Sequence, residues 1–388
     1  MLQTAVGLTI FLAYATTPIV ARRLGEGDHA GAVRAGIDGL WIAVAVGALL
    51  VAIGVPASGA LARAFGADAA VTADATTYLA IGVAGLPAML IVLAATGLFR
   101  GLQDTRTPLW ILAGGFAANA ALNAILVFPA GLGLIGSAIG TVIAQWAMAM
   151  TMLTIVVIRA RRDGVPLAPG RVGLLASATL GGWLFLRTLT LRAVLVGVVV
   201  AAAQHGTVAL ASIQVLFTVF SAAAFALDAL AIAGQAMVGL ALGRGDRAGA
   251  RAILRRLVQL ALVGGIGVGV LLAALSTPLA AVFTPDPAVR AVVAAGTLVI
   301  AAGLPVGAIV WSLDGVLIGA GDGRYLAIAG VINLVVVAPV LVVLTGVPWS
   351  TLWSVVAIQA AFSLLYMLVR LGTLGSRALG DRWMHARV

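Results

Sequence analysis

The 388-residue sequence contains no cysteine, no lysine and few charged residues of any kind. The missing cysteines exclude disulfides, thiol catalysis and metal sites with cysteine ligands. Charged residues make up only 9% of the chain and hydrophobic residues 62%, whereas soluble domains are about 25% charged and about 45–50% apolar. A soluble fold cannot bury this much apolar surface, so the composition indicates an integral membrane protein.

Uncharged stretches of 18 or more residues recur along the whole chain. A helix of that length, rising 1.5 Å per residue, crosses a bilayer core of about 30 Å. The spans must be helical, because lipid offers no partner to unpaired backbone groups. The pattern predicts an all-α integral membrane protein with about eleven spans. They lie at residues 1–21, 36–57, 77–99, 108–128, 134–158, 174–204, 207–240, 257–276, 292–318, 326–346 and 349–370.

The net charge of +10 comes from arginine alone, and most of the 23 arginines lie in short loops between the spans. Such loops report membrane orientation, so no nucleic acid is expected as a partner. Alternate loops hold nearly all of these arginines, including Arg370 after the last span, whereas the opposite loops hold only Arg63 and Arg290. We therefore expect a multi-pass protein of the cell (plasma) membrane with a cytoplasmic C-terminus.

An internal repeat divides the chain into two similar halves. Residues 24–32, beginning Leu-Gly-Glu-Gly-Asp, recur at 242–250 with an offset of 218, and the Ala-Gly-Leu-Pro segment at 84–87 recurs at 302–305 with the same offset. Corresponding loops lie on the same side of the predicted membrane, so the repeats are parallel. Transporters built from two helical bundles commonly have this arrangement.

The repeat predicts two six-helix bundles, of which this chain would hold about eleven of twelve helices. Met1 aligns with Val219, inside the seventh predicted span, so the first helix of the first bundle would be missing. The expected domains are an N-terminal bundle at 1–160, a cytoplasmic linker with a segment leading into the membrane at 161–186, a C-terminal bundle at 187–372, and a cytoplasmic tail at 373–388.

Several motifs resemble the multidrug and toxic compound extrusion (MATE) family. They include the Arg-Leu-Gly-Glu-Gly-Asp run at residues 23–28, its partner at 242–246, and the segment 99–106 that closes the third span. The likeness extends to Asn119, Asn123, Gly136 and Gln145 in the next two spans. Within the family the chain is similar to the DinF-like branch, through residues 186–189, Leu227-Asp228, Gly239 and residues 313–315.

The resemblance implies two six-helix bundles around a central cavity that opens alternately to each side of the membrane. It implies export of small organic, often cationic, compounds, driven by inward flow of H⁺ or Na⁺, by a protein that is usually a monomer. DinF-like relatives place an acidic coupling residue on the first helix of the first bundle. That helix would be absent here, so this coupling site cannot be transferred to the present sequence.

Two aspartates are candidates for cation coupling, because an ionisable residue within a span is costly and therefore a functional candidate. Asp228 falls well inside the seventh span, and Asp314 lies about one and a half turns from the cytoplasmic end of the ninth. The alternative for Asp228 is a structural carboxylate paired with Arg187, with Arg192 or with a backbone break near the cytoplasmic half. The alternative for Asp314 is a gating or helix-packing residue.

Uncharged polar residues in the apolar helices are candidates for lining a substrate cavity, although interhelical hydrogen bonding explains most such residues. They are Asn119, Asn123, Gln204, Gln214, Gln235, Asn333 and Gln359. Pro87 and Pro305, at matching repeat positions, are candidate hinges, with simple helix packing as the alternative. The three histidines are too scattered for a metal site, no catalytic set is evident, and no cofactor is expected beyond the coupling ion.

Three functions fit these patterns. The first is a secondary active multidrug or toxin exporter working by antiport with H⁺ or Na⁺. The second is a lipid-linked oligosaccharide flippase of the same superfamily, which would have a strongly basic cavity. The third is a truncated product that does not transport.

Overall fold

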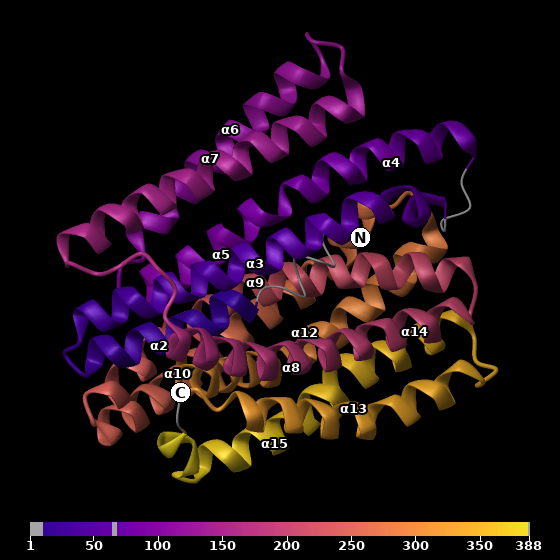
Figure 1. Ribbon diagram of the computed structural model, residues 1–388. Coiled ribbons are helices and arrows are strands. Elements are labelled where there is room, and N and C mark those ends of the chain that lie inside the picture. The colour runs from indigo at the N-terminus through magenta and orange to yellow at the C-terminus, as the bar shows by residue number, and fades with distance from the viewer. Residues whose placement is uncertain (1–10, 64–67, 387–388) are drawn as a thin grey trace. The chain divides into compact units, whose positions relative to one another are not determined.

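The computed structural model describes residues 11–63 and 68–386, and every regular element within them is a helix (Figure 1). Clustering of contacts divides the chain into unit 1, Met1–Gly182, and unit 2, Trp183–Val388. The elements are α2 (Phe11–Gly25), α3 (His29–Arg63), α4 (Ala69–Ala84), α5 (Leu86–Gly101), α6 (Arg106–Val127), α7 (Gly133–Arg162), α8 (Arg171–Ala203), α9 (Thr207–Gly243), α10 (Arg247–Ala274), α11 (Ser276–Phe283), α12 (Pro287–Gly319), α13 (Gly323–Thr345), α14 (Thr351–Ala360), the π-helix η1 (Ala361–Tyr366), α15 (Met367–Leu379) and the 3₁₀-helix η2 (Arg382–His385).

The helices confirm the predicted multi-pass membrane architecture. Ten helical segments of the described residues are long and apolar enough to cross a bilayer. The first predicted span, 1–21, coincides with α2 from Phe11 onwards, and its first ten residues lie outside the described part of the chain. Each of the other ten predicted spans falls on one helix or on consecutive helices, and the last of them, 349–370, covers α14, η1 and the start of α15.

Two segments expected to lie between or after the bundles are helical. The predicted linker, 161–186, contains the start of α8 at Arg171, directly after Pro169 and Gly170, and the boundary between the units falls inside α8. The predicted tail, 373–388, begins with the last two turns of α15. The linker is irregular around Pro166 and Pro169, and no proline follows them before the end of α8, so helix is continuous from Arg171 onwards. No proline interrupts the start of the tail, and α15 continues into it as far as Leu379.

Unit 1 is organised around α5, which packs against α2, α3 and α7. The helices α6 and α7 form a long antiparallel hairpin, visible at the top of Figure 1. A break at Gly85 separates α4 from α5, and Pro87 then occupies the first turn of α5, where its missing N–H is tolerated.

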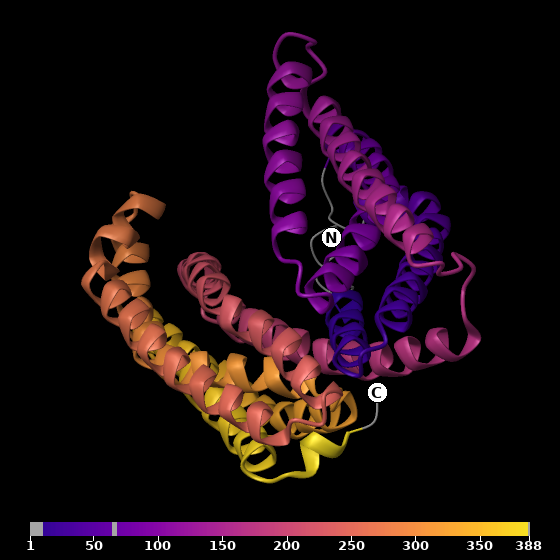
Figure 2. The same cartoon turned by 90° about the vertical axis from the view of Figure 1, so that its left-hand side faces the viewer.

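Unit 2 is organised around α12, which packs against α9, α10, α14 and α15. These helices run alongside one another, from rose to yellow in Figure 2. Two glycines make the α9–α12 contact close. A Cβ atom at Gly319 would lie 2.6 Å from the carbonyl oxygen of Gln235, and one at Gly315 would collide with the carbonyl oxygen of Ala231.

The structure reproduces the sequence repeat at the start of α3 and α10. Asp28 accepts a hydrogen bond from the backbone N–H of Gly31, and Asp246 accepts one from Gly249, both at 2.7 Å. The residue before each aspartate is a glycine with φ of 83° or 72°, which an L-residue rarely adopts. The repeated motif is therefore a loop-and-cap device that begins the second described helix of unit 1 and its counterpart in unit 2.

Candidate functional site

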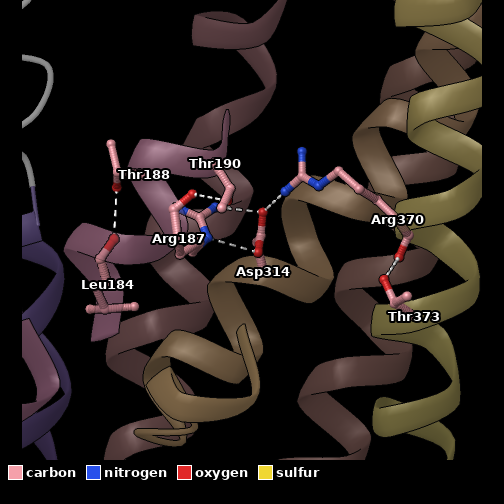
Figure 3. A network of polar contacts seen from close by, with 7 residues as sticks. All are labelled: Leu184, Arg187, Thr188, Thr190, Asp314, Arg370 and Thr373. Atoms are coloured by element: carbon pink, nitrogen blue, oxygen red, sulfur yellow. Dashed lines mark hydrogen bonds and ion pairs between the residues drawn. The ribbon is translucent and has the colours of Figure 1, made fainter. Parts of the chain in front are cut away.

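A buried cluster of charged side chains lies inside unit 2. Asp314 on α12 accepts hydrogen bonds from Arg187 on α8, with Nη2–Oδ2 at 2.6 Å and Nε–Oδ1 at 3.3 Å (Figure 3). Arg370 on α15 donates to the same Oδ2 atom. The three side chains are only 11%, 6% and 6% exposed for Arg187, Asp314 and Arg370. Buried charges persist only when they are paired and hydrogen-bonded, which this cluster achieves across three helices.

This geometry defines the environment of Asp314, one of the two predicted coupling residues. Its carboxylate already faces two guanidinium groups, so an incoming Na⁺ or H⁺ would compete with two fixed positive charges. The arrangement favours the structural alternative for Asp314, a helix-packing or gating residue. Arg370 was expected in a loop because the predicted last span ended there, whereas α15 continues to Leu379 and buries it.

A second layer of polar groups surrounds Arg370. Its guanidinium lies over the ring of Tyr366, 5.6 Å from the centroid, at the end of the π-helix η1. Thr373 donates a hydrogen bond from Oγ1 to Asn333 Oδ1 at 3.2 Å and contacts the carbonyl oxygen of Arg370 at 3.1 Å. Asn333, predicted as a cavity residue, therefore belongs to the α13–α15 contact beside the charged cluster.

Asp228, the other predicted coupling residue, is half-buried in the middle of α9. It precedes Ala231 by three residues and Gln235 by seven, so all three occupy one helix face. Ala231 and Gln235 contact Gly315 and Gly319, which places this face against α12. The carboxylate therefore lies on the α9 face that packs on the central helix of unit 2.

The remaining polar candidates of unit 2 divide into buried and exposed residues. Gln235 is 3% exposed and Gln359 is fully buried. Gln359 donates from Nε2 to Ser363 Oγ at 2.6 Å, and its Oε1 atom has no hydrogen-bond partner. Gln204 and Gln214 are exposed on unit 2. Gln235 and Gln359 are therefore buried between the helices of unit 2, whereas Gln204 and Gln214 lie on its surface.

The polar candidates of unit 1 lie on the α6–α7 hairpin. Asn119 Oδ1 on α6 accepts a hydrogen bond from Thr141 Oγ1 on α7 at 3.3 Å. Asn123 is one turn further along α6, beside Gly140, and its buried Oδ1 atom has no hydrogen-bond partner. The hairpin therefore presents two amide oxygens and a hydroxyl in one row, a set of acceptors suited to a cation or to a hydrogen-bond donor.

The two hinge candidates occupy equivalent contacts but different backbone geometries. Pro87 packs against Gly47, whose Cβ would lie 2.7 Å from the proline Cα, and Pro305 packs against Gly265, at 2.9 Å. The chain breaks at Gly85 before Pro87, whereas α12 continues through Pro305. Only the first of these prolines therefore lies beside a helix break.

An ion pair that the sequence analysis did not find occurs once in each unit. Arg159 donates from Nη2 to Asp104 at 2.5 Å, and Arg377 donates from Nε to Asp322 at 2.6 Å. Asp322 follows Asp104 by 218 residues, and Arg377 follows Arg159 by the same number, which is the offset of the sequence repeat. Each arginine also lies over an aromatic ring, that of Phe99 or that of Tyr325.

Asp104, in the loop between α5 and α6, has a lowered pKa. Partial burial raises the pKa of this carboxyl, but hydrogen bonds from the backbone and hydroxyl of Thr107 and from Arg159 outweigh burial and hold it below its usual range. The charged form is favoured because every one of these partners donates to it. The ion pair of unit 1 is therefore present at all pH values near neutrality.

The charged and polar groups do not form a metal centre in the described part of the chain. No group of three His, Asp or Glu side chains there is arranged to hold a metal ion. Cysteine ligands are excluded by the sequence. The chemistry available is therefore that of carboxylates, guanidinium groups, amides and hydroxyls within apolar helices.

Sequence comparisons relate the chain to one protein family. The family model described as MatE matches residues 2–125 and 187–344. Protein DETOXIFICATION 44, chloroplastic, from Arabidopsis thaliana is 32% identical over 269 residues, which are 68% of this chain and 50% of that protein. The DNA damage-inducible protein F of Escherichia coli strain K12 is 29% identical over 248 residues, 62% of this chain and 53% of that protein. The chain spans about half the length of the curated relatives it matches.

Solved structures share the fold at lower sequence identity. A MATE transporter of Vibrio cholerae superposes with a TM-score of 0.87 at 18% identity, covering 98% of this chain and 87% of that one. A MOP superfamily transporter from Pyrococcus furiosus superposes with a TM-score of 0.88 at 17% identity, covering 98% and 86%. These likenesses confirm the predicted all-helical transporter fold.

Proposed function

Since the chain belongs to the MatE family, whose members are transporters and not enzymes, we propose that it exports small organic compounds, often cationic, by antiport with H⁺ or Na⁺. Family membership supports transport as the activity. The choice between H⁺ and Na⁺ and the substrate are proposals that rest on the chemistry of the helices.

The placement of Asp228 carries this proposal. Asp228 is half-buried on the α9 face that packs against the central helix α12. We assign it the coupling role, because a carboxylate there can exchange a proton or a cation as the α9–α12 packing changes.

The α6–α7 hairpin of unit 1 supplies the polar groups we assign to substrate or cation binding. Asn123 Oδ1 is a buried acceptor without a partner, and Asn119 Oδ1 lies one turn away. A buried unsatisfied acceptor costs about 1–3 kcal/mol, and a bound cation or hydrogen-bond donor would recover that cost. This favours cationic or donor-rich compounds as substrates.

Efflux from proteoliposomes under an imposed H⁺ or Na⁺ gradient tests the proposal. The wild-type protein should expel a fluorescent organic cation faster when either gradient is directed inward than when both are dissipated. Rates that do not respond to any gradient would contradict antiport and would favour the non-transporting alternative.

A lipid-linked oligosaccharide flippase is the second candidate, favoured by the presence of two arginines inside unit 2. Arg187 and Arg370 both donate to Asp314, however, and this pairing reduces the positive charge they offer to a diphosphate. Translocation of a labelled lipid diphosphate by the same proteoliposomes, without drug efflux, would support this second function over the first.

We also propose that the protein lies in the plasma membrane as a monomer with a cytoplasmic C-terminus. The distribution of arginine supports the orientation, because the loops on the predicted cytoplasmic side hold nearly all of the loop arginines. Protease accessibility of a C-terminal tag in inside-out vesicles would check it.

A further inference from the structure

The C-terminal end of the described chain folds back onto the start of α10. Trp383 of η2 is fully buried and donates from Nε1 to the carbonyl oxygen of Ala378 at 3.2 Å. Asp381 forms an ion pair with Arg251 of α10. This segment, residues 380–386, is therefore tied to α15 through Trp383 and to α10 through its polar contacts with Arg247 and Arg251.

A cavity of about 290 Å³ remains between the two elements, several times the roughly 30 Å³ that a water molecule occupies in the liquid. Four charged or titratable residues and two apolar residues line it: Arg247, Arg251, Asp381 and His385, with Ala248 and Met384. Arg247 and Arg251 are four residues apart, so they project from the same face of α10. With one aspartate against two arginines, the lining has a net charge of +1 when the histidine is neutral.

The hydrogen bonding of His385 makes it a further donor to this cavity. Its Nδ1 atom lies 3.4 Å from Nη2 of Arg247. A guanidinium group can only donate, so Nδ1 must accept, and the neutral ring then carries its proton on Nε2. Two guanidinium groups and an imidazole N–H form the donor set that recognises phosphate oxygens.

The same helix continues into an exposed apolar surface. Beyond the cavity α10 exposes Arg255, and from Leu260 onwards it exposes large apolar side chains, among them Val263 at 70% and Val270 at 65%. Leu262, which is 41% exposed, follows Arg251 by eleven residues, about three turns, so it lies on nearly the same face of α10 and roughly 17 Å further along the axis. A phospholipid has the same layout, with a charged phosphate above and acyl chains below.

We propose that this cavity binds the phosphodiester headgroup of an anionic phospholipid, with its acyl chains along the exposed apolar face of α10. A phosphodiester carries one negative charge, which matches the net charge of the lining. Arg247, Arg251 and His385 contact its oxygens, and Asp381, which pairs with Arg251, competes with the phosphodiester for that guanidinium group. A soluble phosphate shares the headgroup chemistry but has no acyl chains for the apolar face.

Lipid binding to the purified full-length protein, followed by native mass spectrometry, tests the site. Phosphatidylglycerol should bind at least tenfold more tightly than phosphatidylcholine, and the double variant Arg247→Ala, Arg251→Ala should lose this preference. Arg324→Ala, an exposed arginine at the start of α13, is the matched control and should retain it. Equal binding of the two lipids, or full retention in the double variant, would overturn the proposal.

Single variants of Arg251 and Asp381 provide a second test, because they should change the affinity for phosphatidylglycerol in opposite directions. Arg251→Ala removes a donor and should weaken phosphatidylglycerol binding, whereas Asp381→Asn removes a competing anion and should strengthen it. A cluster that only anchors the C-terminal segment would instead give two variants with reduced thermal stability and unchanged lipid affinity, which would overturn the proposal. Competition by soluble glycerol phosphate as strong as that by the lipid would overturn the assignment to a lipid.

Discussion

Arg187 on α8 and Asp314 on α12 lie 127 residues apart in the sequence, yet they form an ion pair of 2.6 Å inside unit 2. The pair joins the helix that begins unit 2 to its central helix, and Arg370 adds a third helix. A cluster of this kind fixes the relative rotation of three helices, because each side chain reaches its partners from one helix face only.

Asp314→Ala should destabilise the protein strongly. Removing one member of a buried ionic cluster leaves uncompensated charges and costs about 3–5 kcal/mol. The midpoint of thermal unfolding in detergent should fall well below that of Thr297→Ala, a control at a buried hydroxyl on the same helix that bonds only to its own turn. Equal midpoints for the two variants would show that the cluster does not hold the helices.

Asp104→Asn should show a smaller effect that depends on pH. The folded state lowers the pKa of Asp104, so its contribution is present at neutral pH and is lost as pH falls through that lowered pKa, below about pH 4. Partly exposed ion pairs contribute at most about 1 kcal/mol. The stability difference between wild type and variant should therefore be measurable at pH 7 and shrink towards pH 3, and a difference that grows on acidification would contradict the assigned cause.

Gly315→Ala tests the close α9–α12 contact. The added methyl would collide with the backbone of Ala231, and such overpacking typically costs about 1–3 kcal/mol. Gly267→Ala on α10 is the matched control, because nothing lies within 4 Å of its Cβ position, and it should leave stability unchanged or raise it. If both variants unfold at the same temperature, α12 is not held against α9 by backbone contact.

The spans and the repeat could be predicted because their signals are local. Charge-free runs fix the spans, and the capping aspartates Asp28 and Asp246 stand in nine-residue segments that match at seven positions. The ion pairs Asp104–Arg159 and Asp322–Arg377 obey the same offset, but their partners lie 55 residues apart, and no local pattern indicates that these charges meet.

The charged cluster could not be found in this way, because its members come from three separate helices. Arg187 has no counterpart in the first repeat, and the position equivalent to Arg370 is Met152. Nothing in a single sequence states which faces of α8, α12 and α15 meet. Contacts that depend on helix rotation need the tertiary structure.

The repeated Ala-Gly-Leu-Pro motif shows how context changes a local signal. In unit 1 the chain breaks at Gly85, and the carbonyl oxygen of Ala84 is bonded by Trp146 Nε1 at 3.2 Å. The equivalent position in unit 2 is Leu364, which has no side-chain donor, and there α12 stays continuous while the partner helix becomes the π-helix η1. The identical motif therefore has different backbone outcomes in the two units, and the residues that face it from the neighbouring helices differ as well.

Ion-driven efflux by proteoliposomes containing Asp228→Asn tests the proposed coupling role most directly. The matched control is Asp74→Asn, an exposed aspartate on α4 of unit 1. We expect Asp228→Asn to bind substrate but to lose at least tenfold of its gradient-driven efflux, because an amide cannot exchange a proton, while Asp74→Asn transports at the wild-type rate. Wild-type rates in Asp228→Asn under the same gradient would remove this carboxylate from the mechanism.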